Sequence, residues 1–153
     1  MIGYSDADWC GDKIDRRNTT SFVFMLQGAP ISWSSKKQPI VALSNCEVGY
    51  VVGSSVACQA NWLQNVLEDL MIKLKHLIKL LIDNKSAINL AKNLIAHGKS
   101  KHIETRFHYL RDQVNKFKIK VEYCSTMDQV VDVFIKPVKR VQFLKLRRES
   151  GVI

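Results

Sequence analysis

The first part of the chain alternates short apolar runs with turn residues, which predicts β-strands. The runs Ile2–Ala7, Thr19–Leu26 and Pro30–Ser34 are rich in β-branched and aromatic side chains, the residue types that strands favour. Glycine-containing segments separate the three runs. We therefore expect an antiparallel meander of three strands.

The periodicity becomes helical after Ser44. Apolar residues recur at spacings of three and four from Val52 to Leu70, the pattern of a helix with one buried face. Ser44 and Glu47 have the spacing of a capping box, with Ser44 at the N-cap and Glu47 at the third helical position. The apolar run Leu77–Ile82 then leads directly into a short polar helix, an order typical of a sheet that contains parallel strands.

The last third of the chain predicts further alternation of helices and strands. Pro137 ends the predicted helix over Met127–Ile135, and neither a repeat nor a linker interrupts the series. The whole pattern predicts one α/β domain over residues 1–149, with 150–153 as a short tail. The expected elements are a basic helix over Ile103–Phe117, a strand over Lys118–Cys124, a helix over Met127–Ile135 and a basic helix within Val138–Glu149.

Charge and cysteine usage narrow the function classes. The 153-residue chain has a formal net charge of +9, gathered in residues 97–111 and 136–148, so we expect a polyanion such as nucleic acid as the partner. We find neither a bilayer-length apolar run nor a signal peptide, and expect no membrane association. The scattered cysteines form no Cys-x-x-Cys pair, which favours reduced thiols in an intracellular protein. They are Cys10, Cys46, Cys58 and Cys124.

Three aspartates stand where strand ends and helices are predicted to meet. Asp6 ends the first strand, Asp83 ends a later buried strand, and Asp132 lies among valines. Sites gather at the carboxyl ends of strands in α/β sheets, and hard carboxylate oxygens suit Mg²⁺. Each residue also has a simpler interpretation: Asp6 begins a polar loop with Asp8, Asp83 caps a helix, or Asp132 is a solvated helix position.

Five stretches of the chain, in order, resemble the ribonuclease H domain of copia-type retrotransposon Pol polyproteins. They are GYSDADWCGD, SFVFMLQGAPISWSSKKQPIVALSNCEVGYV, IDNKSAINLAKN, KHIETRFHYLRD and TMDQVVDVFIKP. The resemblance implies a ribonuclease H-like α/β fold, with a five-stranded mixed sheet flanked by helices. It also implies hydrolysis of the RNA strand of RNA–DNA hybrids with two Mg²⁺ or Mn²⁺ ions, in cytoplasmic retrotransposon particles. Asp6, Asp83 and Asp132 would be the catalytic metal ligands.

The chain departs from this family on its first helix. The family carries a catalytic Glu there, and alignment on Tyr50 and Val51 leaves Gly49 at that position. At about 100° per residue, Gly49 lies on the line of the sheet-facing valines, whereas Glu47 points elsewhere. Glu47 is therefore only a weak substitute. No reverse transcriptase or integrase region accompanies the motifs, and we expect an isolated, degenerate fragment with impaired activity.

Two other functions remain open on the sequence alone. A non-catalytic nucleic-acid-binding remnant would keep the basic surface without the chemistry. An integrase-like transferase needs a late Glu on a helix, but Glu122 falls in a predicted strand.

Basic and aromatic side chains complete the sequence-based expectations. His97, His102 and His108 have no zinc-site spacing, and Trp9, Trp33 and Trp62 are expected in the core. The residues expected to contact nucleic acid are Lys99, Lys101, His102, Arg106 and Arg111.

Overall fold

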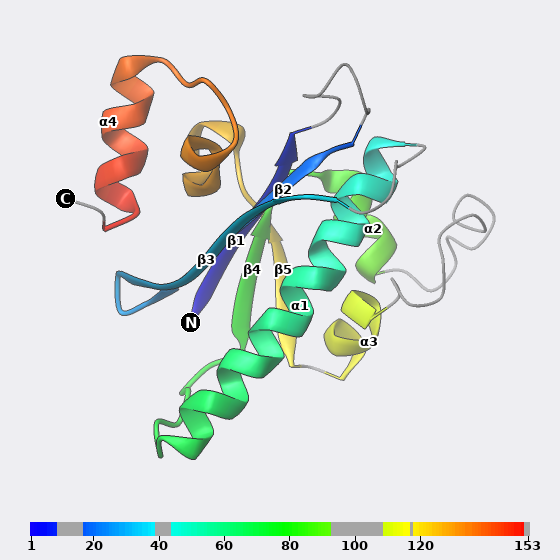
Figure 1. The fold of residues 1–153 in the computed structure, drawn as a ribbon. Helices are drawn as coiled ribbons and strands as arrows, with labels where there is room; N and C mark the ends of the chain where they lie inside the picture. Colours follow the sequence, from blue (N-terminus) through cyan, green and yellow to red (C-terminus); the bar gives the residue numbers. More distant parts are fainter. Residues whose placement is uncertain (9–16, 39–43, 93–108, 117, 152–153) are drawn as a thin grey trace.

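The structure is a computed structural model that describes residues 1–8, 17–38, 44–92, 109–116 and 118–151 (Figure 1). Its strands are β1 (Ile2–Asp8), β2 (Thr19–Leu26), β3 (Ala29–Lys37), β4 (Ile78–Ile82) and β5 (Ile119–Tyr123). Its α-helices are α1 (Asn45–Asp69), α2 (Lys85–Lys92), α3 (Tyr109–Asn115) and α4 (Arg140–Glu149). Two 3₁₀-helices, η3 (Thr126–Asp128) and η4 (Val130–Phe134), lie between β5 and α4.

The five strands form one mixed sheet in the order β3-β2-β1-β4-β5. Strands β1, β2 and β3 pair antiparallel, whereas β4 runs parallel to both β1 and β5. Gln27 and Gly28 link β2 to β3 with φ values of 53° and 82°, the positive φ pair that a type I′ hairpin turn requires. The predicted meander and the predicted ribonuclease H-like α/β fold are confirmed.

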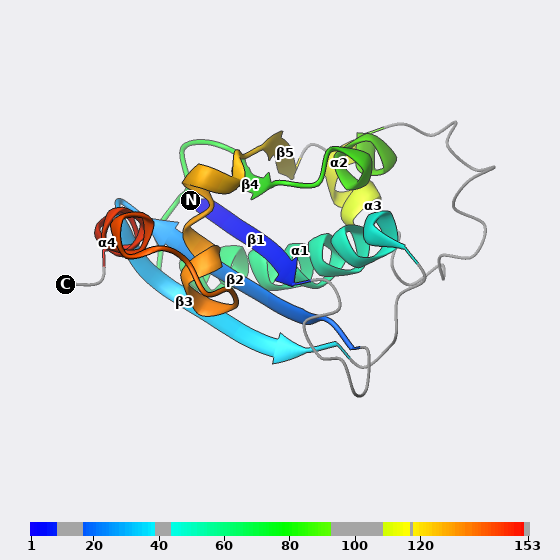
Figure 2. The same ribbon diagram turned by 90° about the horizontal axis from the view of Figure 1, so that it is seen from above.

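Helices cover the two faces of the sheet unequally (Figures 1 and 2). Helix α1 lies across one face with α2 and α3 beside it, and their apolar residues form the main core with β4 and β5. The other face carries η4 and a smaller cluster, and α4 packs against η4. The members of this smaller cluster are Val23, Met25, Val130 and Val131.

Two predictions from the sequence are wrong, one about a helix and one about the burial of two tryptophans. The single helix expected over Met127–Ile135 is two 3₁₀-helices, because Gln129 has an extended backbone (φ −78°, ψ 95°) that separates them. Trp33 and Trp62, expected in the core, are 65% and 56% exposed. Trp33 lies on the edge strand β3 and Trp62 on the outer side of α1, where the described elements leave both rings largely exposed. Trp9 lies outside the described residues.

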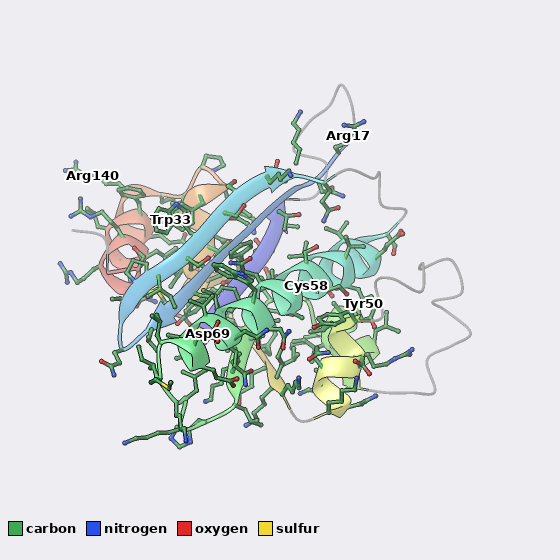
Figure 3. The ribbon with its side chains drawn as sticks, turned by 60° about the horizontal axis from the view of Figure 1, so that its bottom comes forward. Arg17, Trp33, Tyr50, Cys58, Asp69 and Arg140 are labelled. Carbon is green, nitrogen blue, oxygen red and sulfur yellow. The ribbon has the colours of Figure 1, made fainter. Side chains whose placement is uncertain are left out.

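Other expectations concern the thiols and the membrane. Cys58 on α1 (Figure 3) and Cys124 after β5 are free cysteines in the described part of the chain. Among the described helices, none combines the length and apolar character needed to cross a membrane.

Candidate functional site

Two parallel neighbouring strands bring Asp6 and Asp83 to the same end of the sheet. The register pairs Ser5 of β1 with Ile82, the last residue of β4, so each aspartate is the residue that follows one member of this pair. The pKa shift of Asp83 includes a side-chain hydrogen bond with Asp6. This contact follows directly from the strand register.

The 3₁₀-helix η4 adds Asp132 from the far end of the chain. The side-chain amide of Gln129, just before η4, donates a hydrogen bond of 3.1 Å to the carbonyl oxygen of Ser5. This bond holds η4 against β1, and Asp132 is in side-chain hydrogen-bonding contact with Asp6. The three predicted aspartates are thus brought together from three separate elements.

Lys136 neutralises part of this acidic cluster. Its ammonium forms ion pairs with Asp6 and, at 3.1 Å, with Asp132. The side chains of Asp6 and Asp132 are only 7% and 2% exposed, whereas that of Lys136 is 27% exposed. Buried carboxylates need such a partner because removing a charge from water is costly.

Burial and crowding raise the pKa values of Asp83 and Asp132. The pKa of Asp83 rises to about 6, through burial first and then through the charge and hydrogen bond of Asp6. The pKa of Asp132 rises to about 7, again through burial first and then through its hydrogen bond with Asp6. Burial alone would lower the pKa of Lys136, but its two carboxylate partners raise it. Asp83 and Asp132 therefore bind protons at a higher pH than an exposed aspartate does.

An open pocket of about 630 Å³ lies beside the cluster and includes Asp6, Asp83 and Lys136 in its wall. Gly49 of α1 also lines this pocket. A Cβ at Gly49 would lie 3.0 Å from the side-chain nitrogen of Asn84 and 3.1 Å from Cβ of Ala87. Position 49 thus faces the same space as Asp6 and Asp83.

Glu47 occupies a different environment from Gly49. It is 6% exposed and is not among the residues that line this pocket. Its backbone N–H donates a hydrogen bond of 3.2 Å to the side-chain oxygen of the N-cap residue Ser44. This is the Ser44 half of the predicted capping box.

The donor chemistry of the cluster suits a hard cation, but its arrangement does not yet form a metal site. In the described part of the chain, no group of three or more His, Cys, Asp or Glu residues is arranged to hold a metal ion. Carboxylate oxygens are the ligands of Mg²⁺ and Mn²⁺, and the ammonium of Lys136 shows that a cation fits against two of them. The residues fit a metal in type, provided that Lys136 moves.

Of the five residues predicted to contact nucleic acid, Arg111 is the one that lies in the described part of the chain. Arg111 lies on α3, half-buried, and is not among the residues lining the pocket. Lys99, Lys101, His102 and Arg106 lie outside the described residues, as do His97 and His108.

Sequence reasoning missed Lys136, Gln129 and Asn84 as site residues. Lys136 had a usable signal, because it follows Asp132 by four residues and opposite charges at this spacing pair on a helix. Asn84 accepts a hydrogen bond of 2.9 Å from the N–H of Ala87 at the start of α2 and lines the pocket. Gln129 offered no pattern that distinguishes it from a loop residue.

The fold and site together describe an α/β protein of ribonuclease H-like architecture with an acidic cluster at its strand ends. No family model matches the chain. Its sequence is 39% identical over 153 residues to the retrovirus-related Pol polyprotein from transposon RE2 of Arabidopsis thaliana, covering 100% of this chain and 10% of that protein. It is 37% identical over 143 residues to the Pol polyprotein from transposon TNT 1-94 of Nicotiana tabacum, covering 94% and 11%.

A third relative is also a retrotransposon Pol polyprotein of similar identity. The Pol polyprotein from transposon RE1 of Arabidopsis thaliana is 37% identical over 152 residues, with 99% of this chain and 10% of that protein covered. The chain therefore spans about a tenth of the length of the curated relatives that it matches. It is homologous to one segment of retrotransposon Pol polyproteins.

Proposed function

We propose that the chain is a metal-dependent endonuclease domain of ribonuclease H type, derived from a copia-type retrotransposon. Its substrate would be the RNA strand of RNA–DNA hybrids. The observation that carries this proposal is the convergence of Asp6, Asp83 and Asp132 beside an open pocket. The homology to Pol polyproteins supports the same assignment.

The three aspartates would hold two Mg²⁺ or Mn²⁺ ions. Such ions, when bound, activate a water and stabilise the charge that develops during in-line displacement at a phosphodiester. Lys85 at the pocket wall lies 4.7 Å from the ring centre of Tyr123, which also lines the pocket. Its exposed ammonium can orient a substrate phosphate at the pocket mouth.

Gly49 would weaken the reaction, because the family places a Glu there. Loss of even an indirect partner of a metal typically lowers affinity or activity about 10–100-fold. A missing direct ligand should cost at least as much. We therefore expect slow cleavage, with Mn²⁺ better tolerated than Mg²⁺, whose geometry is stricter.

The test is cleavage of a labelled RNA–DNA hybrid by the parent chain, Asp6→Asn and Gly49→Glu. Asp6→Asn should abolish the slow parent activity, and Gly49→Glu should raise it about 10–100-fold. The matched control is Gly49→Gln, which meets the same close contacts with Asn84 and Ala87 but adds no charge. Val48→Glu is unsuitable as a control because Val48 is 2% exposed in the main core.

Two results would contradict the proposal. Folded variants that all fail to cleave the hybrid with either metal would remove the assigned activity. An equal gain from Gln and Glu at position 49 would show that the carboxylate is not the missing element.

The alternative is a non-catalytic nucleic-acid-binding remnant, which the absent side chain at Gly49 favours. Binding through phosphates falls with salt as counterions are released. Neutralising Lys101 and Arg106 together should flatten the slope of log K against log[salt] by about two units. The paired control neutralises Lys73 and Lys75, two exposed lysines between α1 and β4 that lie outside both basic regions. A hybrid that binds with this slope but is never cut would favour the remnant over the enzyme.

A further inference from the structure

We propose that the ammonium group of Lys136 takes the place of a divalent cation between Asp6 and Asp132. Lysine and metal would then bind the same carboxylates in mutually exclusive states. This inference rests on the proposed metal-dependent function, and it assigns Lys136 as a positioning residue that sets the metal affinity of the site.

The backbone places Lys136 directly beside the cluster. The N–H groups of Ile135 and Lys136 both donate hydrogen bonds to the carbonyl oxygen of Asp132, at 3.2 and 2.9 Å. The chain therefore turns tightly after η4, and the long side chain returns over the carboxylate of Asp132. From there its ammonium also reaches Asp6 on β1.

Charge explains why the lysine binds there. Asp6 and Asp132 are both almost fully buried and lie in hydrogen-bonding contact with each other. Two carboxylates this close repel when both are ionised, and either a shared proton or a cation between them relieves the repulsion. Lys136 brings a single positive charge to these two groups, while Asp83 stands in the same pocket wall.

A divalent ion would compete for the same oxygen atoms. It carries twice the charge of an ammonium and binds carboxylates directly. The side chain of Lys136 is 27% exposed and lines the open pocket, so it has a path into solvent. Its flexible stem allows that movement without any change in the backbone.

Competition of this kind lowers the apparent metal affinity. When the binding-competent state is only a fraction of the population, the apparent Kd rises by the inverse of that fraction. Removing the lysine charge should therefore tighten metal binding by about tenfold or more. Restoring a positive charge with arginine should restore weak binding.

The first test measures Mn²⁺ binding from the electron paramagnetic resonance signal of the free ion. The proteins compared are the parent, Lys136→Gln, Lys136→Arg and the control Lys139→Gln, which alters an exposed lysine at the start of α4. Only Lys136→Gln should bind Mn²⁺ about tenfold more tightly. Equal affinity in the parent and Lys136→Gln would overturn this inference while leaving the metal site intact. Absence of binding in every protein would overturn the proposed function as well.

The second test uses the parent chain and needs no variant to fold. The ammonium of an ion-paired, largely buried lysine exchanges its protons slowly enough to give a lysine side-chain NMR signal. Saturating Mg²⁺ should remove the signal of Lys136, because the freed ammonium exchanges with water. A signal that persists once Mg²⁺ has shifted the backbone amide of Asp83 would overturn the inference.

Discussion

The two faces of the sheet bury different kinds of side chain. The face under α1 is a continuous apolar core in which residues such as Leu80 and Val121 are fully buried. The face under η4 has a small apolar cluster and, next to it, the buried polar side chains of Asp6, Gln129 and Asp132. Stability is therefore concentrated under α1, whereas the aspartates gather on the η4 side and at the strand ends, where the first turns of α1 complete the pocket wall.

Burying polar side chains at a site stabilises a small domain less than burying apolar ones. Buried apolar area stabilises the fold at roughly 25 cal/mol per Å², whereas buried polar atoms must each find a partner. The side-chain oxygens of Ser5 and Gln129 are buried without a hydrogen-bond partner. These are two of four such atoms in the described residues. Ser5 precedes Asp6, and Gln129 bonds to the backbone of Ser5, so both lie beside the aspartate cluster; the other two atoms belong to Gln38 and Gln113 elsewhere in the fold.

Substitution of neighbouring leucines on β4 tests this comparison with the largest expected effect. Leu80 faces the α1 core and is fully buried, whereas Leu81 points to the other face and is partly exposed. Leu80→Ala should lower the free energy of unfolding by about 2–5 kcal/mol. Leu81→Ala should cost less than half as much in the same urea titration. Equal losses would show that the two faces contribute alike.

Much of this fold could be predicted because local patterns determine it. The boundaries of β2 were predicted to the residue, and Ser44 is the N-cap of α1 as its capping pattern indicates. Alternation, caps and turn residues act over a few positions, so one sequence displays them. The parallel pairing of β4 followed from its buried strand and the helix directly after it.

The site could be predicted only in part, because its partners are distant in sequence. The sequence pointed to three aspartates that the structure brings together, but the bond from Gln129 to Ser5 spans 124 positions and has no local signature. The prediction that Trp33 and Trp62 are buried was wrong for a similar reason. Their burial depends on whether another element covers β3 and the outer side of α1, and side-chain type does not decide that.

The acidic cluster should also make the stability of the protein depend on pH, which the apolar core does not. Asp83 and Asp132 have pKa values raised from 3.8 to about 6 and about 7, so the folded state binds their protons more tightly than the unfolded state. Stability from this source is present at low pH and is lost as pH rises from about 4 to 7. Without metal, Asp132→Asn should show a smaller fall in melting temperature than the parent across that range. Identical falls would contradict the raised pKa of Asp132.

Removing the N-cap of α1, at the helix end that borders the pocket, should have a smaller effect on the free energy of unfolding. Ser44→Ala removes the side-chain oxygen that accepts the N–H of Glu47, and should cost about 1 kcal/mol of unfolding free energy. Ser55→Ala is the control, because the exposed Ser55 hydroxyl only donates back to the carbonyl oxygen of Val51 within the helix. That control should be neutral or slightly stabilising. Equal losses from both changes would show that the cap contributes nothing specific.

The smallest effect is expected at Gly49, by comparison with Gly53 one turn further along α1. A helix glycine costs up to about 1 kcal/mol relative to alanine, so each Gly→Ala change starts with a gain. At Gly53 the new Cβ would lie 2.6 Å from Cδ2 of Leu110, a fully buried residue whose displacement would exceed that gain.

At Gly49 the nearest atoms are 3.0–3.1 Å away, and Asn84 borders the open pocket into which it can shift. Gly49→Ala should therefore change the free energy of unfolding by less than about 0.5 kcal/mol, whereas Gly53→Ala should be clearly destabilising. Urea titration of both variants measures the difference. A large loss at Gly49 would mean that this end of α1 is packed as tightly as the core. The pocket wall could then not accept the carboxylate that the proposed reaction lacks.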